Sequence, residues 1–414
     1  MARIRGNAIV GQSGGPTAVI NQSLVGVIEA AQSSGVIDRL LGARHGVKGI
    51  LREDFVDLFS QSRETLDEVA LTPSSALGSV RQKPNPDDCY RIFESMRKND
   101  VRFYFYIGGN DSAETVHIVN KAAQDSNYEL RCFHVPKTVD NDLRVTDHCP
   151  GYGSAARFVA SAFMGDNLDN RALPGIKINV VMGRNAGFLT AASALGRKWD
   201  DDGPHLVYMP ERPFLVERFL SDVEGVYGRL GRCIVAVSEG LVDGSDPLKR
   251  TVAETMAEKT SKTLEKDTHA NIQLSGSGAL GDWLANVVRE GLGIEGRLGR
   301  GLRVRADTLG YMQRSFPGVI SEVDALEARE CGRVAVRLAV SEDRDGSVVM
   351  LREPGDYRVR FDYTALVNVA RETRSMPDAF ISPEGSNVTD AFMEYARPLV
   401  GLLPPYGRLS GMGR

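Results

Sequence analysis

The chain repeats one local unit, in which a short apolar run is followed by glycine and polar residues and then by an alanine-rich segment at helical spacing. The first unit runs from Asn7 to Val10, through Gly11-Gln12-Ser13-Gly14-Gly15-Pro16, into residues 18–31. Pro16 suits the first turn of a helix, because its missing N–H would have no partner there in any case. Strands that alternate with helices in this way predict an α/β fold with mostly parallel sheets.

The same pattern predicts five more strands, over residues 101–107, 131–135, 176–182, 205–209 and 233–237. Glycine and polar clusters follow four of them, at Gly108–Ser112, Pro136–Asp142, Gly183–Gly187 and Ser238–Gly240. In open α/β sheets ligands bind past the carboxyl ends of the strands, so we expect the functional site among these clusters. We expect two Rossmann-like three-layer α/β domains whose sheets face each other across an active-site cleft.

At 414 residues the chain exceeds one typical domain. One domain is expected over residues 1–150, with residues from about 314 to 365 returning to it, and the other over 151–313, with about 366–414 returning. Near the C-terminus we predict a strand-like run at 357–361 and a helix at 363–373, and we assign no chemistry to this part.

Composition excludes several classes of protein. The net charge of −4 gives no basic footprint, so nucleic acid and membrane surfaces are not expected partners. No apolar run approaches the length of a membrane span and no secretory signal is visible, so we expect a cytoplasmic protein. The five cysteines are widely spaced without a C-x-x-C pair, which predicts reduced, mostly buried thiols. The six histidines lack metal-ligand spacing and are expected to be structural.

Three of the turns carry chemistry. The Gly14-Gly15 turn is of the kind that cradles phosphate, although a tight strand-to-helix connection would look the same. Gly108–Ser112 is a second such turn, in which Asn110 or Asp111 could instead cap the next helix. Lys137–Asp142 offers a cation, a base and a metal ligand, although a solvated turn could hold the same residues. Because the three turns should meet at one sheet edge, we favour a phosphoryl-transfer site.

Other candidates are weaker. Arg81, Arg184, Arg305 and Arg314 lie near glycines or strand ends and suit phosphate contacts, although any one of them could be a surface arginine. Residues Gly151–Ala156 match the dinucleotide pattern G-x-G-x-x-A, but no strand precedes them. We therefore predict helix packing there rather than a nucleotide site.

Five motifs stand in an order that resembles the phosphofructokinase family, from Gly11 to about Arg314. They are the Gly14-Gly15 turn, Leu77–Arg81, Gly108–Ser112, Pro136–Asp142 with Met182–Arg184, and Gly310–Arg314. The resemblance implies that the first domain binds the phosphoryl donor and that the second binds fructose 6-phosphate.

The resemblance also implies a role for each matching residue. Asp140 would be the general base that takes the proton of the sugar 1-hydroxyl, and the other catalytic residues would be Lys137, Asp111, Thr138 and Arg184. The donor is expected to contact Gly14, Gly15, Arg81 and Asn110. Fructose 6-phosphate is expected to contact Thr138, Asp140, Met182, Gly183, Arg184, Glu239, Arg305, Tyr311 and Arg314.

Two side chains point to the donor. ATP-dependent members of the family have glycine where this chain has Asp111 and Lys137, and the pyrophosphate-dependent branch has aspartate and lysine there. The Asp111 carboxylate would repel a nucleotide α-phosphate by charge and size. Lys137 would offset charge on the transferring phosphoryl group. We therefore expect reversible transfer between diphosphate and fructose 6-phosphate, giving fructose 1,6-bisphosphate and phosphate, in glycolysis or gluconeogenesis.

The resemblance implies Mg²⁺ as the cofactor, with Asn110 and Asp142 as protein ligands, although the family usually has aspartate at the place of Asn110. It also implies a homodimer or homotetramer. Two alternatives stay open, namely an ATP-dependent 6-phosphofructokinase and a catalytically silent regulatory subunit of the same fold. Sedoheptulose 7-phosphate stays open as another acceptor.

Overall fold

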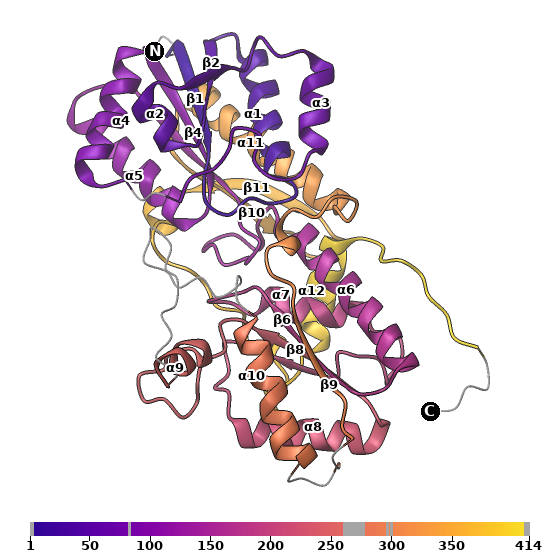
Figure 1. Ribbon diagram of the computed structural model, residues 1–414. Helices are drawn as coiled ribbons and strands as arrows, with labels where there is room; N and C mark the ends of the chain where they lie inside the picture. Colours follow the sequence, from indigo (N-terminus) through magenta and orange to yellow (C-terminus); the bar gives the residue numbers. More distant parts are fainter. Residues whose placement is uncertain (1–3, 82–83, 260–277, 295–297, 299–300, 410–414) are drawn as a thin grey trace. The chain divides into compact units, whose positions relative to one another are not determined.

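The computed structural model describes residues 4–81, 84–259, 278–294, 298 and 301–409, and it divides into two compact units (Figure 1). Unit 1 holds the described residues of 1–154 and 314–374, and unit 2 holds those of 155–313 and 375–409. The chain changes unit after Ser154, Gln313 and Arg374, where the sequence pattern placed the crossings near 150, 313 and 365.

Unit 1 is built on a seven-stranded sheet in the order β11-β10-β5-β4-β1-β2-β3. The inner strands run parallel, and β3 and β11 pair antiparallel at the two edges. The strands are β1 (Gly6–Gln12), β2 (Ile37–Ala43), β3 (Phe55–Asp57), β4 (Val101–Gly108), β5 (Arg131–Pro136), β10 (Gly346–Arg352) and β11 (Val359–Thr364). The helices are α1 (Ile20–Ser34), α2 (Val47–Arg52), α3 (Arg63–Leu71), α4 (Pro86–Lys98), α5 (Asn110–Asp125) and α11 (Glu322–Ser341).

Alternating side chains of the central strands fill two separate cores, one on each face of this sheet. Phe103, Phe105 and Ile107 of β4 pack into the core that contains α1 and α11. Tyr104 and Tyr106 of the same strand pack with α2, α4 and α5 instead. Figure 1 shows the two groups of helices on opposite faces. The strand period of two therefore produces three layers, with the strand ends left open for a site.

Unit 2 has a smaller sheet of four parallel strands in the order β7-β8-β6-β9. The strands are β6 (Ile176–Val181), β7 (Leu206–Tyr208), β8 (Cys233–Ser238) and β9 (Val304–Thr308). The longer helices of this part of the chain are α6 (Tyr152–Ala172), α8 (Val216–Leu230), α9 (Val252–Lys259), α10 (Ala279–Val288) and α12 (Asp390–Val400), and a short helix, α7 (Phe188–Ala192), follows β6. The apolar side chains of β6 and β8 pack into one core with α8 and α10, as those of buried parallel strands do.

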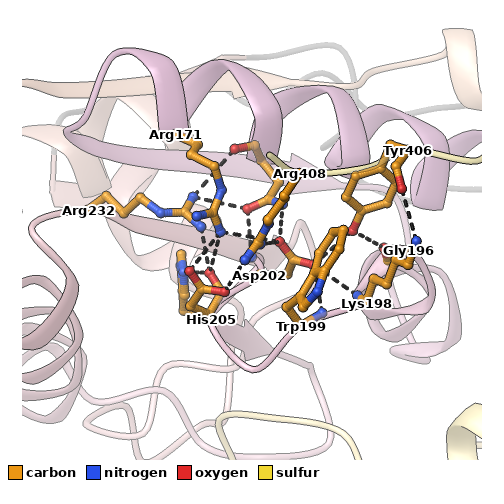
Figure 2. A network of polar contacts seen from close by, with 12 residues as sticks. Arg171, Gly196, Lys198, Trp199, Asp202, His205, Arg232, Tyr406 and Arg408 are labelled. Carbon is orange, nitrogen blue, oxygen red and sulfur yellow. Dashed lines mark hydrogen bonds and ion pairs between the residues drawn. The ribbon is translucent and has the colours of Figure 1, made fainter. Parts of the chain in front are cut away.

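The tail that follows α12 is bound to unit 2 through the buried carboxylate of Asp202 (Figure 2). This carboxylate accepts hydrogen bonds from the backbone N–H groups of Lys198 and Trp199, both at 2.9 Å, and from the Tyr406 hydroxyl at 2.8 Å. The Arg408 guanidinium pairs with the same carboxylate and lies 4.0 Å from the centroid of the Trp199 ring. Tyr406 and Arg408 of the tail therefore both bind the buried Asp202 carboxylate.

The strands expected from the recurring unit are present as β1, β4, β5, β6, β7 and β8, and Gly151–Ala156 leads into α6, as predicted. The helix predicted at residues 363–373 is wrong. Strand β11 runs to Thr364 and a short 3₁₀ turn, Leu366–Asn368, follows it. Pairing with β10 imposes the strand period on Tyr363 and Thr364, the first two residues of the predicted helix.

The cysteine prediction is confirmed, because all five cysteines are free and buried. His134, expected to be structural, is buried between β5 and β10 and contacts the Ser347 hydroxyl and the carbonyl oxygen of Gly108, both at 2.8 Å. No helix in the described part of the chain combines the length and the apolarity that a bilayer crossing requires.

Candidate active site

Lys137 is the central cation of the candidate site in unit 1. It follows β5 directly and is only 3% exposed, and its ammonium donates a 2.7 Å hydrogen bond to the carbonyl oxygen of Gly15. The neighbouring Gly14 has a φ of 77°, a left-handed conformation that favours glycine. The Ser79 hydroxyl donates a 2.6 Å hydrogen bond to the Gly14 carbonyl oxygen. The glycine turn and the lysine are therefore held together before any ligand binds.

The electrostatics around Lys137 favour an anion. Burial, together with the guanidinium groups of Arg314 and Arg81, lowers the pKa of Lys137 to about 7, while Asp140 and Asp142 act in the opposite direction. Arg314 also lies against the glycine turn, since a Cβ on Gly15 would be 3.2 Å from its Cζ. A buried ammonium beside two arginines is stabilised when a negatively charged group approaches.

The loop after Lys137 brings two carboxylates together. The Thr138 hydroxyl donates a 3.3 Å hydrogen bond to Asp142 and accepts one of 3.1 Å from the backbone N–H of Asp140. Burial and the nearby charge of Asp140 together raise the pKa of Asp142 to about 7. One carboxylate of such a pair readily holds or takes up a proton, which is what a general base requires.

The start of α5 forms a further edge of this site. Asn110 is the first helical residue, and its side-chain amide donates a 3.1 Å hydrogen bond to the carbonyl oxygen of Arg371. Asp111 is the acidic residue of the first turn, where the helix dipole favours negative charge. Neither residue is the helix cap, because that position is held by Gly109, which has no side-chain hydrogen bond to give. The capping alternative considered from the sequence is therefore wrong.

The predicted metal ligands do not form a complete coordination site made of protein side chains. Among the residues that the structure describes, no three His, Cys, Asp or Glu side chains surround a common position. The close pair Asp140 and Asp142 nevertheless fits Mg²⁺, because a cation would relieve the repulsion that raises the Asp142 pKa. Mg²⁺ commonly uses one or two carboxylates and completes its shell with water and phosphate oxygens.

In unit 2 the predicted sugar-phosphate residues gather past the ends of β6 and β8. Gly183 has a φ of 139°, its backbone N–H donates a 3.4 Å hydrogen bond to Glu239, and its carbonyl oxygen accepts one of 2.6 Å from the Ser238 hydroxyl. Arg184 is next in the chain, and its backbone lies so close to Gly240 that a Cβ there would be 2.1 Å from the Arg184 carbonyl oxygen. Met182, directly before Gly183, is buried.

Arg305 lies apart from that group, whereas Tyr311 follows the carboxyl end of β9, which pairs with the carboxyl end of β6. Arg305 is opposite Lys177 in the β6–β9 pairing, near the amino ends of both strands, whereas Gly183 and Glu239 follow the carboxyl ends of β6 and β8. Lys177 itself forms an ion pair with Asp307. Tyr311 is 42% exposed. Within one chain, the structure therefore does not bring Arg305 to the other predicted sugar-phosphate residues of unit 2.

Sequence reasoning missed two residues that support the loops of unit 1. Ser79 binds the Gly14 carbonyl oxygen, whereas the sequence indicated it only as a member of the Leu77–Arg81 motif. Arg374 donates hydrogen bonds to the loop that carries Asp140 and Asp142, from a segment to which no chemistry was assigned. Only the fold shows these partners, since each pair is distant in the sequence.

Comparison with known proteins shows which chains this one resembles. Residues 7–339 match the phosphofructokinase family. A pyrophosphate–fructose 6-phosphate 1-phosphotransferase of Rhodospirillum rubrum is 53% identical over 96% of this chain and 95% of its own length. A protein of the same name from Xanthomonas campestris is 34% identical over 95% of this chain and 91% of its own length.

A solved structure is similar over almost the whole chain. It is the pyrophosphate-dependent phosphofructokinase of Nitrosospira multiformis, with a TM-score of 0.82 and 32% identity, covering 98% of this chain and 94% of the other. The sequence motifs that resemble the family end near Arg314. The matches extend well beyond that residue, so the C-terminal part is shared with these relatives too.

Proposed function

The chain belongs to the phosphofructokinase family, and on this premise we propose that it is a pyrophosphate-dependent 6-phosphofructokinase. It transfers a phosphoryl group from diphosphate to the 1-hydroxyl of fructose 6-phosphate, giving fructose 1,6-bisphosphate and phosphate, and the transfer is reversible. The observation that carries the proposal is the buried Lys137 ammonium bonded to the Gly15 carbonyl, with the Asp111 carboxylate at the start of α5.

Unit 1 would bind the diphosphate. Lys137, Arg81 and Arg314 supply positive charge beside the Gly14-Gly15 turn, and cations already in place there neutralise a polyanion without reorganising when it binds. Asp111 would act against a nucleotide, because its carboxylate repels an α-phosphate. The donor preference would then come from charge placement rather than from the fold.

Asp140 would take the proton from the sugar 1-hydroxyl as the new bond to phosphorus forms. Thr138 orients the loop through its bond to the Asp140 backbone N–H and so fixes where the carboxylate lies. In unit 2, Gly183, Arg184 and Glu239 would hold fructose 6-phosphate, with Met182 and Tyr311 completing its contacts. These residues need only position the sugar, since most of the catalysis of phosphoryl transfer is positioning and electrostatics.

Mg²⁺ would bind at Asp142 and Asn110, with Asp140 close by and diphosphate oxygens completing its shell. When bound, it would neutralise charge on the diphosphate. Asp142 contributes a carboxylate that is already held by the Thr138 hydroxyl, so its orientation does not depend on the ion.

A homodimer or homotetramer would explain the position of Arg305. Because this arginine lies near the amino end of β9, it would reach the sugar phosphate of a second copy of the chain rather than that of its own. We place the enzyme in the cytoplasm, in glycolysis or gluconeogenesis, where sugar phosphates and diphosphate are both available.

The deciding experiment compares donors at fixed fructose 6-phosphate, with and without Mg²⁺. We expect the wild type to prefer diphosphate over ATP by at least about 100-fold in kcat/KM, a difference of about 2.7 kcal/mol. The double variant Asp111→Gly/Lys137→Gly should lose most of that preference. Its matched control is Lys121→Gly/Asp125→Gly, which removes the same two charges from exposed positions on α5.

A wild type that prefers ATP would refute the proposed donor. A pure, folded chain that turns over neither donor would instead support the regulatory-subunit alternative. Loss of preference in the control variant would show that the effect does not come from the site.

A further inference from the structure

Arg374 lies at the end of the segment that follows β11, and its guanidinium binds the loop that carries Asp140 and Asp142. Its Nε donates a 3.0 Å hydrogen bond to the carbonyl oxygen of Asn141. Its Nη1 donates one of 2.6 Å to Thr146, and its Nη2 one of 2.9 Å to Asp147, again to carbonyl oxygens. A single planar fork thus joins three backbone carbonyls of one loop.

The backbone of Arg374 makes a fourth contact to the same loop. Its N–H donates a 2.8 Å hydrogen bond to the carbonyl oxygen of Asp142. One residue earlier, Thr373 pairs with Leu143 in an isolated antiparallel bridge. Leu143 also packs in a small buried cluster with Val369 of the same segment. The arginine is therefore anchored to the loop from both its side chain and its main chain.

The loop needs such external support because its own backbone is strained. Asn141 has a φ of 60° and Val145 a φ of 68°, and both lie in the left-handed region. This region costs L-residues roughly 1–2 kcal/mol each, and a β-branched valine is especially unfavourable there. Since Asn141 stands between Asp140 and Asp142, relaxation of this residue would turn both carboxylates. The strained conformation persists only while surrounding groups hold it.

We propose that Arg374 is a positioning residue for phosphoryl transfer, which holds the loop 141–147 so that Asp140 and Asp142 keep their catalytic orientation. That Arg374 holds the loop follows from the hydrogen bonds. That this affects phosphoryl transfer rests on the proposed function. Arg374 has no expected contact with either substrate. Its loss should therefore lower kcat while leaving both KM values nearly unchanged.

The test compares the wild type with Arg374→Ala and Arg374→Lys. A misplacement of about 1 Å in a catalytic group costs up to roughly 100-fold, so we expect kcat to fall roughly 10- to 100-fold in Arg374→Ala, with KM for fructose 6-phosphate and for diphosphate each within about threefold. Arg374→Lys should recover only part of kcat, because one ammonium cannot reproduce the planar fork that serves three carbonyls.

A second measurement does not depend on the reaction. Hydrogen exchange of the peptide that spans residues 138–150 should become faster in Arg374→Ala, while exchange in β1 and β4 stays as in the wild type. The matched control is Arg360→Ala, which removes an exposed arginine of the same unit that pairs with Asp362. This control should change neither kcat nor the exchange of the loop.

Unchanged exchange of the loop in Arg374→Ala would overturn the inference, and so would faster exchange with kcat within twofold of the wild type. A parallel rise of both KM values with a large fall in Tm would also overturn it, since that pattern marks general loss of structure. If the wild type uses ATP instead of diphosphate, the proposed donor fails, and the same comparison of kcat is then made with ATP.

Discussion

The Lys137 ammonium and the Gly15 carbonyl oxygen lie 2.7 Å apart, so one buried hydrogen bond joins the loop after β5 to the turn after β1. The two residues are distant in the sequence, yet the parallel pairing of β1, β4 and β5 brings their strand ends to the same edge. A ligand that binds at the glycine turn would therefore lie beside the Lys137 ammonium.

Removing the charge of Lys137 should slow the reaction with diphosphate. We expect Lys137→Met to lower kcat roughly 100- to 1,000-fold, the loss typical when one preorganised electrostatic contact to a transition state is deleted. Steady-state assays in both directions measure it, with the exposed Lys121→Met on α5 as the control. A loss of less than about threefold would show that Lys137 has no electrostatic role in the transition state.

Binding of diphosphate should take up a proton at pH 8. The pKa of Lys137 is lowered to about 7 by burial and by Arg314 and Arg81, so much of this lysine is neutral at that pH. An anion beside it raises its pKa and restores the charge. Calorimetric titration in two buffers of different ionisation enthalpy gives the number of protons taken up. This uptake should disappear in Lys137→Met, and equal uptake in both proteins would assign the proton elsewhere.

Substituting the proposed base should affect the chemical step rather than binding. Asp140→Asn keeps the shape of the side chain but cannot accept the hydroxyl proton, so we expect kcat to fall roughly 100- to 10,000-fold with little change in KM for fructose 6-phosphate. Asp125→Asn, at the exposed end of α5, is the control. Near-normal turnover of Asp140→Asn would require another base.

Loss of the buried carboxylate of Asp202 should destabilise unit 2. In Asp202→Ala the N–H groups of Lys198 and Trp199 lose their acceptor, the Tyr406 hydroxyl keeps only the Gly196 carbonyl, and Arg408 keeps only its pair with Asp201 (Figure 2). We expect a loss of about 3–5 kcal/mol, as when one partner of a buried ion pair is removed. Thermal unfolding of the purified chain measures it, and Asp390→Ala, on the exposed first turn of α12, should leave Tm nearly unchanged.

The contribution of Asp202 should also fade in acid. Burial by itself would raise the pKa of this carboxyl, but hydrogen bonds from Lys198, Trp199, Asn167 and Tyr406 hold it below its ordinary value of 3.8. The folded chain then binds fewer protons than the unfolded chain near that pH. The stabilisation is complete above pH 3.8 and is lost as the pH falls through the lower folded-state pKa. The Tm difference between wild type and Asp202→Asn should therefore stay nearly constant from pH 6 down to about pH 4 and shrink below pH 3.8.

The sequence predicted the parts of the fold that depend on local pattern. Glycine turns after buried runs marked the ends of β1, β4 and β6, and a polar turn marked the end of β5, because parallel strands and their crossover helices leave that signature. The loop at Lys137 was found for the same reason. Its geometry was not, because the strained Asn141 and Val145 depend on support from Arg374, which no local pattern reveals.

The failures have the same physical cause. Residues 363–373 fitted a helix locally, but Tyr363 and Thr364 pair with β10 and Thr373 forms a bridge with Leu143, and such contacts with distant residues override propensity. The Asp202 network was also invisible in the sequence, since it joins a tail arginine to an acid that lies far upstream. Residues that act through distant partners are found only when the fold places them together.

The order of strands in unit 1 has a consequence for biosynthesis. Strand β5 ends at Pro136, but its sheet neighbour β10 begins only at Gly346, so the ribosome delivers the strand that leads to Lys137 long before it delivers the strand that covers its edge. An uncovered strand edge can pair with other chains. During translation the growing polypeptide should therefore depend on chaperones at this edge, and nascent chains stalled before β10 emerges should aggregate more readily than those stalled after β11.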